Sequence, residues 1–180
     1  MIEIKAMAED YILDRCPLGE PLDPSSTPED DNPSYGDRTR AIRRRFFRQV
    51  RDRYGNCVFL AWDEGKVVGF LMFFPKPVAR KLGIYALPAH ELEDETLVYA
   101  CMQFAPAYRG RGLGTRLVEA LIAWAGEYGW RRIEFNGVGS GAQDEDWRWG
   151  WALPKWRRLG FETVKDEPPF SVVLNVGDQR

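Results

Sequence analysis

The stretch YRGRGLGTRL, residues 108 to 117, places glycines at positions 110, 112 and 114 between arginines and leads directly into an apolar, helical pattern. The preceding run, TLVYACMQFAP (96–106), has the β-branched and aromatic content of a strand. The run RRIEFNGV (131–138) is the next strand. A strand, a glycine-rich turn, a long helix and a second strand predict a βαβ crossover at the centre of the fold.

The helix of this crossover is expected over LGTRLVEALIAWAGEYGW (113–130), with its apolar residues three or four positions apart. That spacing predicts a broad face buried against a sheet. The stripe comprises Leu113, Leu117, Leu121, Trp124 and Tyr128. Gly129 follows as a left-handed stop signal.

The rest of the chain adds mainly antiparallel elements around this unit. We expect an edge strand in IEIKAM (2–7) and a hairpin in which NCVFLAWDEG (56–65) turns at Gly65 into KVVGFLMFFP (66–75). The segment 75–95 is predicted to be a loop, and residues 144–160 a tryptophan-rich helical segment that restarts at Pro154. FETV (161–164) and FSVVLNV (170–176) close the sheet. We find no domain boundary, so residues 1–180 form one domain with a mobile, acidic, proline-rich loop at about 17–37.

Composition limits the function classes. The chain has 180 residues, 44% hydrophobic and 29% charged, as in a globular protein, and its longest apolar runs are too short to span a bilayer. The N-terminus lacks the basic start and apolar stretch of a signal peptide, and three widely spaced cysteines are typical of reduced thiols, so we expect a cytoplasmic protein. His90 is the only histidine and no CxxC occurs, so no metal site is expected.

Charge is unevenly distributed although the net charge is only −2. Residues 1–37 hold ten acidic and two basic side chains, whereas residues 38–53 hold eight arginines. Ile42, Phe46, Val50 and Tyr54 recur every four residues, which favours a solvated helix with one apolar stripe. Binding of an anionic polymer by this helix stays open as an alternative.

The glycine-rich turn is suited to an anion. Where a helix begins directly after glycines, its first N–H groups are unpaired and its dipole places partial positive charge there. Glycines let the backbone approach a phosphate, and Arg109 and Arg111 add charge. A Walker A loop would need GK[ST], but Thr115 and Arg116 follow Gly114. A Rossmann fingerprint is also a poor match, because its third glycine is replaced and the unit lies late in the chain.

The pattern that fits is RxxGxG, formed by Arg109, Gly112 and Gly114 after a strand that ends CMQFAP. It resembles the coenzyme A motif of the GNAT superfamily N-acetyltransferases, and RRLGF (157–161) is similar to that superfamily's YEKLGF ending. The resemblance implies an α/β fold of mixed α+β type, with a mostly antiparallel sheet of about six or seven strands flanked by helices. It also implies acetyl-CoA as cosubstrate. Acyl transfer in the superfamily is direct attack of an amine on the thioester.

Carried over residue by residue, the resemblance implies two groups of coenzyme contacts. Backbone groups for pantetheine would come from Met102, Gln103 and Phe104. The pyrophosphate would be bound by Arg109, Gly110, Arg111, Gly112, Leu113, Gly114 and Thr115.

The catalytic residues match the superfamily less well. The tyrosine that commonly protonates the leaving thiolate is replaced by Trp156, which has no acidic proton, and a frequent coenzyme-contacting asparagine is replaced by Trp149. Glu134 falls where some members carry a glutamate that accepts the amine proton; a surface carboxylate paired with Arg131 or Arg132 is an equal alternative. Tyr99 shares a strand face with Cys101 and Gln103; a core or sheet-packing role is favoured for it, and a catalytic role is the alternative. His90 is expected to be a loop residue.

Four tryptophans, at positions 147, 149, 151 and 156, exceed what one helical stripe can bury. Core packing or a homodimer contact is one interpretation, and an aromatic acceptor pocket formed by Trp149, Trp156 and Asn136 is the other. We therefore expect an acyl-CoA-dependent N-acyltransferase that acetylates a small-molecule or protein amine without nucleic acid or membrane. The alternatives are a non-catalytic acyl-CoA-binding sensor, favoured by Trp156, and nucleic-acid binding through residues 38–53.

Overall fold

The computed structural model describes residues 1–12, 33–84, 86–138, 153–165 and 170–178. Their seven strands form one sheet in the order β1-β2-β3-β4-β5-β7-β6. In chain order the strands are β1 (Glu3–Ala6), β2 (Val58–Asp63), β3 (Lys66–Pro75), β4 (Thr96–Phe104), β5 (Arg132–Val138), β6 (Glu162–Thr163) and β7 (Phe170–Asn175). The helices are α1 (Pro33–Tyr54), α2 (Lys76–Lys81), α3 (Leu113–Glu127) and α4 (Leu153–Arg158). The predicted fold class, a mixed α/β fold with a mostly antiparallel sheet, is confirmed.

Contacts group the chain into two compact units. Unit 1 comprises Met1–Leu71 and Gln103–Leu117, and unit 2 comprises Met72–Met102 and Val118–Arg180. β3, β4 and α3 each run from one unit into the other. That the chain is one domain stays a prediction.

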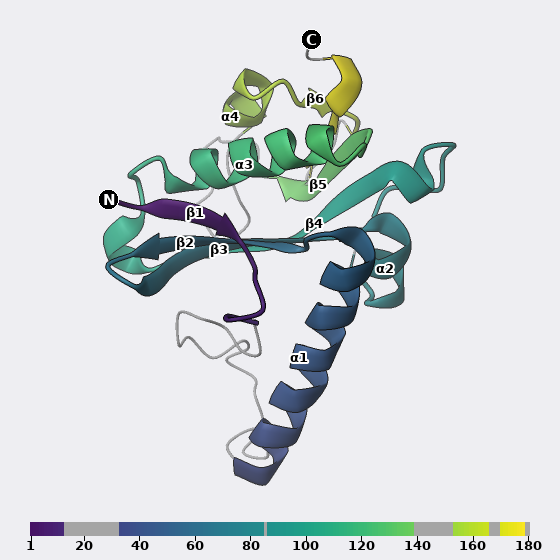
Figure 1. The fold of residues 1–180 in the computed structure, drawn as a ribbon. Coiled ribbons are helices and arrows are strands. Elements are labelled where there is room, and N and C mark those ends of the chain that lie inside the picture. The colour runs from purple at the N-terminus through teal and green to yellow at the C-terminus, as the bar shows by residue number, and fades with distance from the viewer. Residues whose placement is uncertain (13–32, 85, 139–152, 166–169, 179–180) are drawn as a thin grey trace. The chain divides into compact units, whose positions relative to one another are not determined.

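In unit 1, the predicted edge strand and hairpin are confirmed. β1 pairs antiparallel with β2, from Glu3 opposite Trp62 to Ala6 opposite Phe59, and β1, β2 and β3 lie side by side (Figure 1). The hairpin turns at Glu64 and Gly65, both with positive φ (48° and 76°), as a two-residue loop between twisted strands requires.

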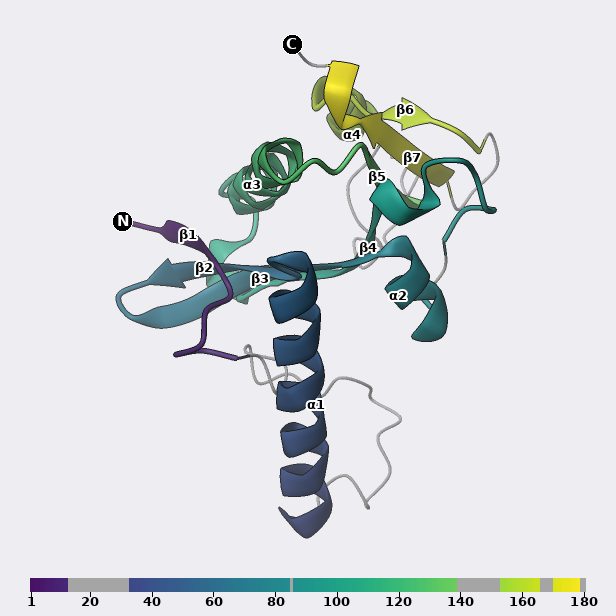
Figure 2. The same cartoon turned by 45° about the vertical axis from the view of Figure 1, so that its right-hand side comes forward.

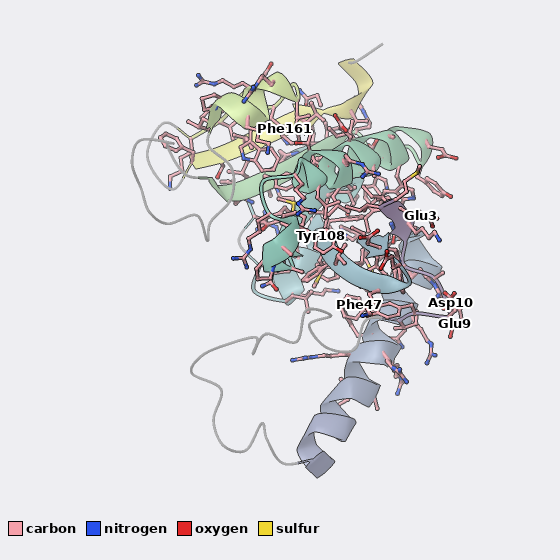
Figure 3. All side chains as sticks on the ribbon, turned by 90° about the vertical axis from the view of Figure 1, so that its left-hand side faces the viewer. Glu3, Glu9, Asp10, Phe47, Tyr108 and Phe161 are labelled. Atoms are coloured by element: carbon pink, nitrogen blue, oxygen red, sulfur yellow. The ribbon has the colours of Figure 1, made fainter. Side chains whose placement is uncertain are left out.

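Helix α1 starts earlier than the sequence indicated and buries a different stripe. Residues 33–37, which we assigned to the loop, begin the helix at Pro33, where the missing N–H costs nothing. The remainder of that predicted loop lies outside the described residues. Phe47 and Val50 are buried, whereas Ile42 is 65% exposed, so the predicted stripe is only partly correct. Beside α1 (Figure 3), Glu9 accepts hydrogen bonds from Arg48 and Arg51, each at 2.8 Å.

In unit 2, β5 pairs antiparallel with β7, and β6 continues this sheet on the other side of β7 (Figure 2). β4 and β5 are parallel, which confirms the crossover. The core of this unit contains Phe73, Leu97, Val98, Leu121, Ile133, Phe135, Trp156, Phe161 and Leu174, all with at most 2% exposure.

Three details of unit 2 differ from or refine the sequence prediction. The segment predicted as a loop after β3 begins with helix α2. Pro77 does not prevent this helix, since it stands in the first turn, where proline is tolerated. Helix α3 ends at Glu127 and Gly129 has the expected positive φ of 78°, but Tyr128 lies past that end and is 58% exposed. Helix α4 starts one residue before Pro154, as expected. None of the helices among the described residues combines the length and the apolar character needed to cross a membrane.

Candidate active site

The glycine loop, residues 109–114, lies in unit 1 between a short helical turn (Pro106–Tyr108) and α3. Gly110 and Gly112 have φ values of 73° and 76°, a region that side chains disfavour. A Cβ atom at either position would meet no atom within 4 Å. Glycine is therefore favoured here by backbone conformation, and no described atom fills the space beside either residue. Gly114 has no positive φ and lies in the first turn of α3.

The start of α3 presents N–H donors to this loop that have no acceptor among the described residues. The first helical hydrogen bond runs from Arg116 N to Gly112 O at 3.2 Å. The N–H groups of Leu113, Gly114 and Thr115 precede that bond and point out of the helix end, where the dipole adds partial positive charge. Arg109 and Arg111 are exposed beside them. These groups together form an anion-binding geometry.

Two hydrogen bonds hold the glycine loop in place, and a glycine in β3 allows the end of β4 to lie close to β3. Tyr108 ends the short helical turn that follows β4 (Figure 3), and its hydroxyl donates to Asp63 Oδ2 at 2.7 Å. Arg109 Nε donates to Phe104 O at 3.4 Å. A Cβ at Gly69 in β3 would lie 2.7 Å from Phe104 Cδ1, so Gly69 lets the end of β4 approach closely. Sequence reasoning missed Gly69, although a glycine inside a strand is itself a signal of close backbone approach.

β4 and β5 pair only over their first residues. The parallel ladder of Thr96, Leu97 and Val98 ends where Val98 faces Glu134, although both strands continue. Beyond this point the described part of β4 does not pair with β5. The three expected pantetheine contacts, Met102, Gln103 and Phe104, lie in this half-buried stretch.

Glu134, the candidate base, is fully buried at the end of this ladder in unit 2. Its Oε1 accepts hydrogen bonds from Lys76 Nζ at 2.9 Å and from His90 Nε2 at 3.1 Å, and its Oε2 accepts one from Leu87 N at 3.1 Å. Arg132 Nε lies 3.6 Å from Oε1. We call these five residues the Glu134 cluster. The alternative of a surface carboxylate paired with Arg131 or Arg132 is partly correct: Arg132 is an ion-pair partner, but the Glu134 side chain has no exposure, so the surface location is wrong.

Two members of the cluster were not expected from the sequence. Lys76 is as buried as Glu134 and also donates to Pro88 O at 3.0 Å. Its signal was a lysine in the otherwise apolar run FFPKPV. His90 is a loop residue, as expected, but its ring contacts Glu134. Because Leu92 N donates to His90 Nδ1 at 3.1 Å, the proton of a neutral ring lies on Nε2 and points at the carboxylate.

Tyr99 and Trp156 pack around Phe135 of β5, whose side chain points to the sheet face opposite to that of Glu134. The Tyr99 ring stacks on Phe135 with centroids 4.6 Å apart, and burial raises the pKa of its hydroxyl. Trp156 lies 4.2 Å from Phe135 and 5.1 Å from Phe161 and is 1% exposed. The proposal that Trp156 lines an acceptor pocket is therefore wrong, because its indole is used in the core.

Of the other two candidate acceptor residues, the structure describes Asn136 alone. Asn136 is half-buried on β5, on the face that carries Glu134, opposite Ser171 of β7. Trp149 lies outside the described residues, as do Trp147 and Trp151. Among the described residues, His, Cys, Asp and Glu side chains form no group of three or more that could hold a metal ion.

Comparison with known proteins gives the family. The model of the Acetyltransferase (GNAT) family matches residues 22–148, which is more than half of the chain. No curated protein is similar enough to be matched.

Solved structures with the same fold are distant in sequence. The ribosomal-protein-S18-alanine N-acetyltransferase of Escherichia coli is 14% identical, with a TM-score of 0.56 over 98% of this chain and 94% of that one. A Pyrococcus horikoshii protein is 18% identical, with a TM-score of 0.54 over 97% and 98%. A Salmonella typhimurium protein, whose structure contains its cofactor acetyl-CoA, is 18% identical, with a TM-score of 0.55 over 78% and 75%. These likenesses show the fold, and the family match completes the assignment: the chain belongs to the GNAT family of acetyltransferases.

Proposed function

We propose that this protein is an acyl-CoA-dependent N-acyltransferase that transfers acetyl from acetyl-CoA to a primary amine. The observation that carries the proposal is the glycine loop, where Gly110 and Gly112 have positive φ and no described residue accepts a hydrogen bond from the first N–H groups of α3. A pyrophosphate suits such a site because it needs many short hydrogen bonds and positive charge. Family membership and the acetyl-CoA of the Salmonella relative support the choice of donor.

The protein's part in this reaction is to position the reactants. The amine nitrogen bonds to the acyl carbon as the C–S bond breaks, the electron pair leaves on sulfur, and the amine loses a proton. The glycine loop would hold the phosphates, and the stretch Met102–Phe104, which lies beyond the ladder with β5, would bind the pantetheine amides. Positioning of this kind supplies much of the rate enhancement when two reactants must meet.

Tyr99 is our candidate donor of a proton to the leaving thiolate. It follows Val98, the last residue of β4 that pairs with β5, and burial raises its pKa, so the phenol keeps its proton at neutral pH. Tyr99→Phe should lower kcat by about tenfold or more and leave the KM for acetyl-CoA unchanged. An unchanged kcat would remove Tyr99 from the mechanism.

A second candidate function is a non-catalytic acyl-CoA sensor. It is favoured by Trp156, which stands in place of the superfamily's acidic tyrosine and packs in the core. A panel of small amines and peptide N-termini with acetyl-CoA separates the two functions. Coenzyme A release that requires an amine supports the enzyme, whereas tight binding of acetyl-CoA without release under any amine supports the sensor.

A further inference from the structure

The Glu134 carboxylate accepts more hydrogen bonds than is suitable for a general base that must take up a proton. The carboxylate receives three hydrogen bonds and has no exposed atom. Protonating it would leave the Lys76 ammonium buried without its counter-charge, and an unpaired buried charge is strongly unfavourable. A general base must also reach the proton that it removes. Both ring nitrogens of His90 are likewise engaged, by Glu134 and by Leu92 N.

What the cluster does hold is the segment 86–92, which has no helix or strand in it. Leu87 N–H is bound by Glu134, Pro88 O by Lys76, and the His90 ring by Glu134. Two further contacts, from Arg80 Nη2 to Leu87 O at 2.8 Å and from Thr96 Oγ1 to Leu92 O at 2.6 Å, are independent of them. An irregular segment depends on such partners for its backbone polar groups. Three of these five contacts, including the one to the Leu87 amide, are lost if the Lys76–Glu134 pair is removed.

The segment is fixed at a particular place in unit 2. Glu134 faces Val98, the last paired residue of the parallel ladder, and β4 and β5 part beyond it. On the same face, Asn136 and Ser171 come next. The Ser171 hydroxyl is 1% exposed and, among the described residues, has no hydrogen-bond partner. A buried hydroxyl in that state is expected to gain a partner, such as a polar group of a bound acceptor.

We propose that Glu134 is a positioning residue: with Lys76 it fixes segment 86–92 as a wall of the acceptor site, and the acceptor amine arrives already deprotonated instead of giving its proton to Glu134. This proposal rests on the proposed N-acyltransferase function. A positioning role requires that both side-chain oxygens of Glu134 accept hydrogen bonds and that its charge stays the same during the reaction. A general base would instead take up a proton.

Two double variants separate the positioning role from the base role. Both remove the charges of residues 76 and 134 together, but only one keeps a hydrogen-bond acceptor at position 134. Lys76→Met/Glu134→Gln retains a carbonyl oxygen for Leu87 N–H, whereas Lys76→Met/Glu134→Leu does not. We expect the Gln variant to keep kcat and the amine KM within about threefold of the parent. The Leu variant should raise the amine KM about tenfold or more and leave the acetyl-CoA KM within about twofold. In the parent and the Gln variant, kcat/KM should rise with pH along the ionisation of the amine itself.

Two kinetic results would overturn the proposal. If both variants lose kcat alike by about 100-fold or more, with the amine KM unchanged, then Glu134 is the base. If both keep the parent's constants, segment 86–92 has no part in acceptor binding. Thermal melts of both variants establish that each is folded at the assay temperature.

Hydrogen exchange tests the anchor without relying on turnover. The Leu87 amide should exchange slowly in the parent and the Gln variant and faster in the Leu variant, while amides of residues 117–121 in α3 stay equally protected in all three. Equal Leu87 exchange in all three proteins would reject the anchor. If the parent acetylates no amine, the proposed function fails on its own, and the exchange result still decides whether Glu134 holds the segment.

Discussion

The glycine loop of unit 1 and the Glu134 cluster of unit 2 are built in opposite ways. The glycine loop consists of backbone: two glycines with positive φ, three N–H groups at a helix end, and no described atom within 4 Å of where a Cβ of Gly110 or Gly112 would lie. In the Glu134 cluster, Lys76, His90 and the Leu87 N–H bind a fully buried carboxylate at 2.9–3.1 Å. The described residues leave hydrogen-bonding groups of the first unused, whereas both carboxylate oxygens of the second already accept hydrogen bonds.

Because of this difference, changes in the two regions should affect different quantities: ligand affinity for one and the free energy of unfolding for the other. Donors that stay unpaired in the free protein contribute free energy only when a ligand arrives, so changes in the glycine loop should alter affinity more than stability. A buried carboxylate bonded to lysine, histidine and a backbone amide contributes in the free protein. Changes in the Glu134 cluster should therefore alter the free energy of unfolding first.

The largest expected effect comes from breaking the buried pair. Lys76→Met leaves the Glu134 carboxylate buried without its nearest cation and should lower the free energy of unfolding by about 3–5 kcal/mol. Denaturant titration followed by circular dichroism measures the loss. Lys76→Met/Glu134→Leu should regain part of it, because no unpaired charge stays buried, although Leu87 N–H and Pro88 O still lose their partners.

An exposed ion pair is the matched control for that change. Arg48 contacts Glu9 at 2.8 Å with both side chains about half exposed (46% and 60%). Arg48→Met should leave the denaturation midpoint within error, because solvent screens such pairs. A loss as large as that of Lys76→Met would mean that burial does not distinguish the two pairs.

The next largest effect concerns the glycine loop. Gly112→Glu places a carboxylate where the phosphates are expected and should abolish the stabilisation by acetyl-CoA, which is about 2.7 kcal/mol at 100 times Kd. Thermal melts with and without acetyl-CoA measure this. Gly83→Glu is the control, because Gly83 also has a positive φ (70°) and open space around it. If Gly112→Glu is stabilised as well as Gly83→Glu, the loop is not the phosphate site.

The sequence predicted the glycine loop because every part of it is local. Gly110, Gly112 and the start of α3 lie within a few residues of one another, and the β4–α3–β5 crossover around them follows from chain order. Positive φ, unpaired N–H groups and the helix dipole all follow from residue type and spacing. Whether acetyl-CoA binds there stays a prediction.

The Glu134 cluster could not be predicted in the same way. Lys76 and Glu134 are 58 residues apart in sequence, and their pairing depends on where α2 and segment 86–92 lie relative to β5. A single carboxylate on a strand has the same pattern whether it is buried or exposed. Trp156 illustrates the same limit: its spacing left a pocket and a core position open, and its contact with Phe135, 21 residues earlier, decided for the core.

A smaller effect tests how β4 approaches the glycine loop. Gly69→Ala would bring a Cβ to 2.7 Å from Phe104 Cδ1 and 3.2 Å from Gln103 O. We expect a loss of about 1–3 kcal/mol in stability and a weaker affinity for acetyl-CoA, because the end of β4 must move. Denaturant titration and calorimetry measure the two. Gly126→Ala within α3, where the nearest atom is 3.4 Å away, should instead be neutral or stabilising.

The smallest effect is expected at Tyr108, a side chain that supports a site built of backbone. Tyr108→Phe removes the hydrogen bond to Asp63 and should weaken acetyl-CoA binding by no more than about threefold at pH 8. The bond to Asp63 raises the pKa of Tyr108, so its contribution is complete below the ordinary pKa of 10 and is lost as pH rises through the raised value. Calorimetric titration of both proteins with acetyl-CoA measures the difference. A loss of 100-fold or more would show that this side chain, and not the backbone alone, builds the glycine loop, and the contrast with the Glu134 cluster would then disappear.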